Sequence, residues 1–188
     1  MTLEKDLFRA LFEPNKNRLI ELIELYKIDI NKYTDFSSQN SILIESLLCK
    51  KAQQGTTEQL EIITYLINKN VDLNWKNKSG FNALHIALAH HELSKISLLL
   101  IKNDKMDIHV IEDKNGNNPI FTAIREYGKT WREEQKELNQ LRFEIINVLL
   151  KRGADLDKIN HSGISSRRWI EISNDKKLHD LIEKHDAK

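Results

Sequence analysis

A four-residue pattern recurs four times along the chain and marks it as a repeat protein. The pattern is an apolar residue, Asp, Leu or Ile, and then Asn, Asp or His, and its copies begin at residues 28, 71, 106 and 154. Before each copy, apolar residues recur at the spacing of an amphipathic helix that buries one stripe. These segments are 18–26, 60–67, 93–100 and 143–150. Such self-similarity predicts a stack of helical units.

A polar turn with a glycine follows three of the four copies, at Gly80, Gly116 and Gly163. After the first two glycines, the sequence predicts short helices of small and apolar residues over 82–88 and 118–124. Pro119 suits a first helical turn, because the N–H that proline lacks would have no partner inside the helix there. The repeating unit is therefore a turn, a short helix, a second helix and a loop.

Residues 77–87 and 113–123 resemble the opening of the ankyrin repeat, and residues 149–157 resemble its end. The shared features are a turn glycine, a helix start and a small residue for helix stacking, all at fixed offsets. The resemblance implies an all-α fold, an ankyrin-repeat solenoid of about five helix-pair units with N- and C-terminal caps. We expect one domain over 1–188, with units at approximately 3–36, 37–76, 77–112, 113–159 and 160–188.

Some units depart from the family pattern. The first lacks the turn glycine, and the last has Arg167 and Arg168 where the family has Leu-His, so we expect both units to be caps with a polar outer face. In the second unit, 39–46 replaces the usual helix start. The second and fourth units exceed the family's period of about 33 residues. Their extra residues, 50–58 and 127–140, should lengthen the helices or form loops between them.

Composition excludes several classes of partner and compartment. Lys and Arg number 29 against 28 Asp and Glu, so no overall field attracts nucleic acid or acidic lipid. The longest fully apolar run, 98–101, is too short to cross a membrane, and the charged N-terminus does not match a signal peptide. A single cysteine, Cys49, excludes an internal disulfide and favours a reduced cytoplasm. We therefore expect a cytoplasmic protein that binds neither nucleic acid nor membrane.

No motif for phosphate binding, nucleophilic catalysis, zinc proteolysis or calcium binding occurs in the sequence. His85 matches the family's histidine at the start of a first helix, which implies a structural role. His90 and His91 are adjacent and diverge by about 100° on a helix, which disfavours a metal site. Cys49 lies on a predicted apolar helix and should be a buried, inert thiol. We expect a protein that is not an enzyme, with no catalytic residue, cofactor or metal.

The resemblance implies a concave binding face made of the turn tips and the exposed side of each first helix. Carried over by position, this face contains Tyr33, Asp35, Phe36, Ser37, Trp75, Lys76, Lys78, Phe81, His90, Glu112, Lys114, Asn117, Arg125, Glu126, Ile159, His161 and Ile164. Trp75 and Phe81 are either exposed hot-spot residues or packed against neighbouring turns. The extra segment of the fourth unit offers a rival contact, Trp131 with its flanking Arg132 and Glu134.

These features predict a non-catalytic protein–protein binding module that is a monomer when free. Its size and architecture, and its richness in Lys, Asn and Ile, resemble the ankyrin immunity proteins that neutralise toxins between bacteria. That resemblance implies a cytoplasmic inhibitor or immunity protein that occludes a protein target such as a bacterial toxin. The alternative is an adaptor or secreted effector that docks on a host protein.

Overall fold

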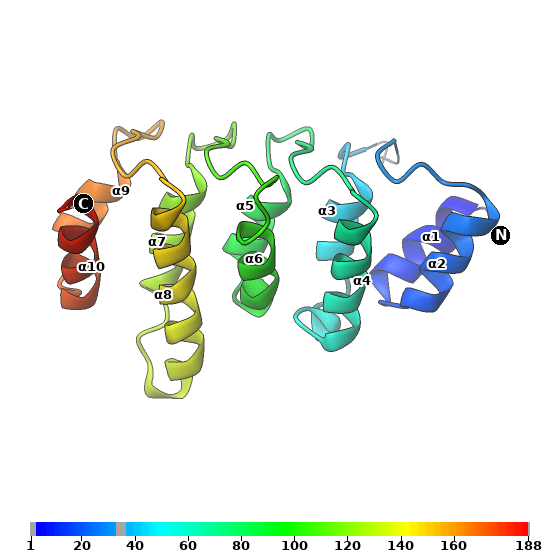
Figure 1. The fold of residues 1–188 in the computed structure, drawn as a ribbon, viewed down its shortest axis with the longest axis horizontal. Coiled ribbons are helices and arrows are strands. Elements are labelled where there is room, and N and C mark those ends of the chain that lie inside the picture. Colours follow the sequence, from blue (N-terminus) through cyan, green and yellow to red (C-terminus); the bar gives the residue numbers. More distant parts are fainter. Residues whose placement is uncertain (1–2, 33–36, 188) are drawn as a thin grey trace.

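The computed structural model describes residues 3–32 and 37–187, and over these ranges the helices form five antiparallel pairs in a row (Figure 1). The pairs are α1 (Leu3–Phe12) with α2 (Lys16–Leu25), α3 (Ile42–Leu47) with α4 (Thr57–Asn68), α5 (Ala83–Ala89) with α6 (Ser94–Ile101), α7 (Pro119–Tyr127) with α8 (Lys136–Lys151), and α9 (Ser166–Glu171) with α10 (Lys176–Asp186). Short 3₁₀ helices cover Lys51–Gln53, His91–Leu93 and Glu133–Gln135. The expected helical solenoid is confirmed.

Four of the first helices begin at a capping side chain. Ser41, Asn82, Asn118 and Ser165 each accept a hydrogen bond from the backbone N–H three residues later, at 3.0 to 3.3 Å. Such caps satisfy one of the N–H groups that a helix start leaves unpaired. They also give α3, α5, α7 and α9 a common register, so residues at the same distance from the cap occupy equivalent positions.

The core lies between and within the helix pairs, as the amphipathic pattern predicts. The register of the repeats predicts that eight positions in segments 82–88, 93–100, 118–124 and 143–150 are buried between units, and of these Leu99 is partly buried. The other seven are at most 1% exposed, and these are Leu84, Ala87, Ile96, Ile120, Ala123, Ile146 and Leu149. The assigned register is therefore confirmed.

Replacing Ala87 with leucine should lower the free energy of unfolding by about 1–3 kcal/mol, because α5 packs on both α6 and α7 with no space for a larger side chain. Urea unfolding followed by circular dichroism measures the change. Ala89→Leu, on the exposed side of the same helix, is the control and should stay within about 0.5 kcal/mol of wild type. Equal losses in the two variants would contradict the stacking of α5.

The repeated four-residue pattern forms the loop after each second helix and joins neighbouring units. In each copy, the Asp side chain accepts the backbone N–H two residues later. The Asn31 side chain then accepts the N–H of Asp72 at 2.6 Å and donates to the carbonyl of Asn70 at 3.2 Å. Asn74 makes the same two contacts with the next unit, to Asp107 and Lys105. The pattern thus recurs because its last residue links one loop to the next.

An arginine continues this linkage where the asparagine is missing. His109 occupies the asparagine position in the third unit. There Arg152 reaches back from the end of α8 and donates to the carbonyls of Ile101 at 2.7 Å and Met106 at 2.8 Å. It thereby satisfies the Ile101 carbonyl, which the end of α6 leaves free, and the Met106 carbonyl in the loop that follows.

The extra residues of the second and fourth units lie at the edge opposite the turns that connect the pairs (Figure 1). In the second unit they form a loop that includes Lys51–Gln53. In the fourth unit they form the 128–135 loop and also lengthen α8, which has 16 residues against 8 in α6. Both expected outcomes therefore occur, a loop in each unit and a longer helix in one.

Candidate protein-binding face

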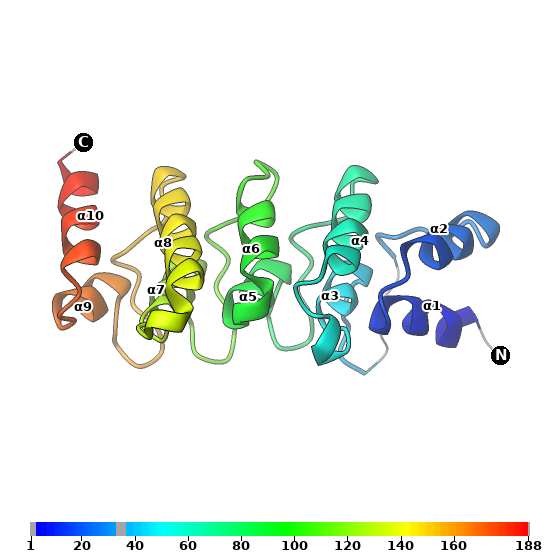
Figure 2. The ribbon, with the colours of Figure 1, turned by 90° about the horizontal axis from the view of Figure 1, so that it is seen from below.

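The turns that connect the pairs are held by polar side chains within them and across to the preceding turn. The Oδ1 atoms of Asn77 and Asn160 each accept N–H bonds from the residues two and four positions later, all at 3.0 Å. Their Nδ2 groups donate to Asn40 Oδ1 and Asn117 Oδ1 of the preceding turn, at 3.0 and 2.9 Å. We call 75–81, 111–117 and 159–164 the turn tips. In Figure 2, the loops between the pairs project beyond the first helices.

Glu112 holds the middle turn in the same way. Its carboxylate accepts the N–H groups of Lys114 at 2.7 Å, Asn115 at 2.9 Å and Asn117 at 3.2 Å. Burial raises the pKa of Glu112, but these hydrogen bonds outweigh that effect and hold the pKa below its ordinary value. Glu112 and Asn117, which the sequence placed on the exposed face, are therefore buried groups that hold the turn together.

Trp75 and Phe81 both pack locally. The indole Nε1 of Trp75 donates to the carbonyl of Gln39 at 2.8 Å, and its ring packs against the core. The Phe81 ring lies edge-on to His85, with 6.0 Å between ring centroids. Both side chains are partly buried. Of the two alternatives, exposed hot-spot residues or residues packed against neighbouring turns, the second therefore applies. Their replacement would therefore disturb the turns as well as any contact with a partner.

The remaining expected residues on the turn tips are mostly exposed. Tyr33, Asp35 and Phe36 lie outside the described residues, and Ile164 is partly buried. Exposed side chains are those of Ser37, Lys76, Lys78, Lys114, Ile159 and His161. Lys76 Nζ reaches the carbonyl of Ile111 in the next turn at 3.1 Å, which leaves the lysine at the surface. The turn tips thus present mainly cationic and polar groups.

A row of residues at the ends of the first helices is apolar and exposed at three of its four positions, and its other member, Arg125, is partly buried. Seven positions after the caps stand Leu48, Ala89, Arg125 and Ile172. Leu48 and Ile172 are 40% and 63% exposed. Three residues before Ala89 in the chain, Ile86 is partly buried, and three residues before Ile172, Trp169 is exposed. We call these six residues the inner face. Sequence reasoning placed only Arg125 of this set on the binding face, although counting from the four caps would have found the others.

The first unit adds two aromatic side chains beside this row. Phe8 and Phe12 of α1 are exposed and stacked, with 5.5 Å between ring centroids. The backbone N–H of Lys50 donates to the carbonyl of Phe12 at 2.9 Å, so α1 ends next to Leu48. The two exposed aromatic side chains therefore belong to the helix whose end meets the segment after Leu48.

A charged cluster surrounds Glu126, next to Arg125 of the inner face. Glu126, at 4% exposure, lies 2.7 Å from Lys129 Nζ, 3.0 Å from Arg125 Nε and 3.6 Å from His91 Nε2. Burial raises the pKa of Glu126, but Lys129 and Arg125 outweigh it and hold the pKa below its ordinary value. Glu126, also expected at the exposed face, is therefore a buried anchor for these cations. His90, the residue before His91 in the chain, is exposed, as expected.

His85 is buried at the start of α5 and carries no role at the surface. Its backbone N–H donates to Asn82 Oδ1, and its ring Nδ1 accepts the backbone N–H of Asn82 at 3.4 Å. Burial lowers the pKa of His85 to about 4, against the opposing charge of Glu112. The ring is therefore neutral at pH 7, as the structural role implied by the resemblance requires.

Acidification should consequently destabilise the fold through His85. Below about pH 6.5 the unfolded chain binds a proton that the folded chain does not, so stability is complete above this pH and is lost progressively down to about pH 4. We expect a loss of about 2 kcal/mol between about pH 7 and pH 5, measured by urea unfolding. Most carboxylates of the unfolded chain titrate below this window. An unchanged pH dependence in His85→Gln would contradict the assignment.

The described residues offer no metal-binding cluster, and their one thiol is protonated. No group of three or more His, Cys, Asp or Glu side chains is placed to hold a metal ion in the part of the chain that the structure describes. Cys49 is buried just after α3, and burial raises the pKa of its thiol to about 11, so it is protonated at neutral pH. Among the described helices, none combines the length and apolar character needed to cross a membrane.

Comparison with known proteins agrees with this architecture. A family model described as ankyrin repeats, in three copies, matches residues 48–160. A probable serine/threonine-protein kinase of Dictyostelium discoideum is 25% identical over 118 residues, which are 62% of this chain. The matched segment is only 12% of that kinase, so the similarity concerns a small part of it.

Proposed function

The chain belongs to the ankyrin-repeat family and is therefore a protein–protein interaction module, and we propose that it holds one protein target on its inner face and inhibits it by occlusion. The observation that carries this proposal is the row at equivalent positions of the first helices, in which Leu48, Ala89 and Ile172 are apolar and exposed and Arg125 is partly buried. Solenoids of this kind bind partners on an extended surface formed by many units.

The composition of the inner face supports a protein partner. Trp169 and Arg125 belong to the residue types that dominate binding energy in protein interfaces. Apolar side chains lie toward both ends of the row, and the cations Arg125 and Lys129 lie in its middle. The lysines of the turn tips border this surface, where rim charges act mainly on the association rate. This arrangement suits a target whose binding surface is apolar at both ends and acidic in the middle.

We propose a bacterial toxin as the class of target, and the cytoplasm as the site of action. The resemblance in size and composition to ankyrin immunity proteins motivates the first point. The protonated, buried thiol of Cys49 is compatible with a reducing compartment. Occlusion requires that the target lose its activity in proportion to the complex formed. A captured target that keeps its activity while bound would instead indicate an adaptor.

Affinity capture from the native source, followed by affinity measurements on variants, tests the binding face. Leu48→Asp and Ile172→Asp should each weaken binding at least tenfold, or about 1.4 kcal/mol, because a carboxylate replaces an apolar contact. Leu25→Asp is the matched control, since Leu25 is 65% exposed but lies on a second helix. If Leu25→Asp weakens binding and the two inner-face variants do not, the face is wrongly assigned.

A further inference from the structure

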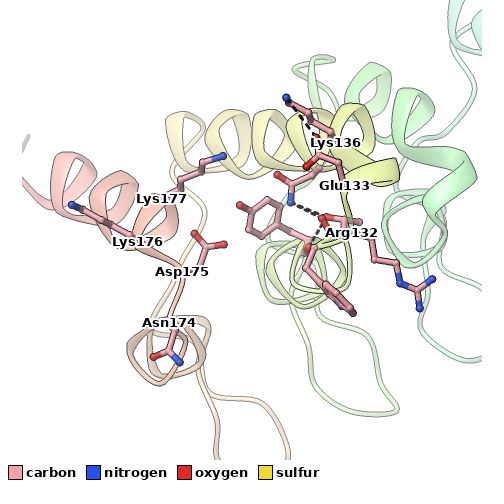
Figure 3. Close-up of a pocket in the computed structure, with 11 residues that line it drawn as sticks. Arg132, Glu133, Lys136, Asn174, Asp175, Lys176 and Lys177 are labelled. Carbon is pink, nitrogen blue, oxygen red and sulfur yellow. Dashed lines mark hydrogen bonds and ion pairs between the residues drawn. The ribbon is translucent and has the colours of Figure 1, made fainter.

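The unequal lengths of the fourth and fifth pairs leave an open groove at the edge opposite the turn tips. Helix α8 has 16 residues and α10 has 11, so the start of α8 and the 128–135 loop extend beyond α10 (Figure 1). The groove has a volume of about 460 Å³. Lys176, Lys177 and Asp175 line it from the α10 side, and Arg132, Glu133 and Lys136 line it from the α8 side (Figure 3).

Positive charge dominates the lining of this groove. Four cationic and two anionic side chains line it, a local surplus of two in a chain whose total net charge is +1. Both carboxylates are already engaged, since Asp175 accepts the N–H of Leu178 at 3.1 Å and Glu133 lies 3.9 Å from Lys136. Over the described residues, no ion pair involves Lys176, Lys177 or Arg132. These cations are therefore available to an incoming anion.

The orientation of the charged side chains places cations both inside and around the groove. In Figure 3, Lys177 points from α10 toward the α8 side, whereas Lys176 and Arg132 point outward. Burial, together with the charge of Asp175, raises the pKa of Tyr127 to about 12, so this lining residue is uncharged at neutral pH. A ligand in the groove would therefore meet a neutral phenol and ammonium groups.

An exposed tryptophan lies at the same groove. Trp131 is 78% exposed, more than any other large apolar side chain in the described residues. The guanidinium of Arg132 lies 5.6 Å from the centroid of its ring, a cation–π geometry that orients both groups. An indole that no neighbouring element covers, beside unpaired cations, is the combination that protein interfaces favour at their energetic centres.

We propose that this groove is a second interaction site and that its occupant is an acidic segment of a partner protein, with carboxylates near Lys177 and Lys136 and an apolar group on Trp131. A nucleic acid fits less well, because the groove offers four cations and one exposed aromatic side chain, whereas single strands bind along a longer basic track with several stacking aromatics. The groove lies at the edge opposite the turn tips, so it would operate whether or not the inner face binds its own target.

Titration with an acetylated, amidated octaglutamate peptide tests this proposal on the full chain. In nitrogen-15 spectra, the indole N–H of Trp131 and the backbone amides of Lys176 and Lys177 should shift, and the indole signals of Trp75 and Trp169 should not. The double variant Lys176→Glu/Lys177→Glu should bind the peptide at least tenfold more weakly. Trp131→Ala should weaken it at least threefold. Raising the salt from about 0.05 M to about 0.5 M should also weaken binding.

Lys184→Glu is the control, because Lys184 is exposed on the same helix but does not line the groove. It should bind octaglutamate as wild type does, within twofold. The proposal is overturned if the groove signals do not shift, or if Lys184→Glu weakens binding as much as the double variant. It is also overturned if an oligothymidylate of similar charge binds at these signals more tightly than the peptide. None of these results depends on the inner face.

Discussion

Replacing Arg142 with alanine should lower the free energy of unfolding by about 3–4 kcal/mol, the largest effect we expect from a single substitution. Arg142 of α8 is fully buried, and it donates to the carbonyls of Leu88 at 2.5 Å and His90 at 2.6 Å. These carbonyls end α5, so one guanidinium joins the third pair to the fourth. Alanine would leave both carbonyls without this donor and would open a cavity where the side chain packs.

The buried charge opposes part of this stabilisation. Burial lowers the pKa of Arg142 to about 10, against the raising influence of Glu126 and Glu92, so the folded state carries a desolvation cost. Arg142→Met removes that cost and keeps most of the volume, but it still leaves the Leu88 carbonyl without this donor and the His90 carbonyl with the N–H of Leu93 alone. We therefore expect a loss of about 2 kcal/mol for methionine, smaller than for alanine.

Urea unfolding of these variants separates packing from hydrogen bonding. Arg168→Ala, at an exposed arginine of α9, is the control and should stay within about 0.5 kcal/mol of wild type. A methionine variant as stable as wild type would show that the guanidinium–carbonyl contacts do not hold α8 to α5.

Gly55→Ala should lower the free energy of unfolding by about 2–4 kcal/mol, the second large effect. Gly55 belongs to the extra loop of the second unit and has φ +76°, in the left-handed region. A Cβ there would lie within 2.3 Å of the backbone carbonyl oxygen of Glu92, in the third unit, so the loop would have to move away. The substitution thus tests whether this loop packs on the neighbouring pair.

Gly153→Ala provides the matched control for backbone strain. Gly153 also has a left-handed φ, of +82°, but a Cβ there would meet nothing within 4 Å. Gly153→Ala should lower the free energy of unfolding by only about 1 kcal/mol, the cost of the backbone conformation alone. Equal losses at Gly55 and Gly153 in urea unfolding would contradict the close approach of the loop to Glu92.

The helical architecture could be predicted because its determinants are local. The spacing of apolar residues in 143–150 fixes the buried stripe of α8, and Pro119 and Asn118 mark the start of α7. The residues that link the units could be detected as a repeated sequence pattern, but the hydrogen bonds that they make between units could not be predicted from it. Nothing local indicates that Asn31 bonds to Asp72, or that Arg152 replaces the missing asparagine beside His109.

The binding residues were harder to predict, because exposure depends on contacts between units. By analogy with the ankyrin repeat, Glu112 and Glu126 hold positions that face outward. In the structure, neighbouring N–H groups surround the carboxylate of Glu112, and cations surround that of Glu126. Leu48 and Ile172 were missed for a different reason. Their units lack the family's usual helix start, and only the caps Ser41 and Ser165 place them in register with Ala89.

Hydrogen exchange of the chain, alone and with its captured partner, tests the central claim most directly. The amides of the turn tips and the carboxyl ends of the first helices, 88–91, 125–129 and 171–173, should exchange more slowly in the complex. Exchange in the second helices, 57–68, 94–101 and 136–151, should be unchanged. Protection confined to the second helices, with the turn tips unaffected, would show that the protein does not bind its target through the inner face.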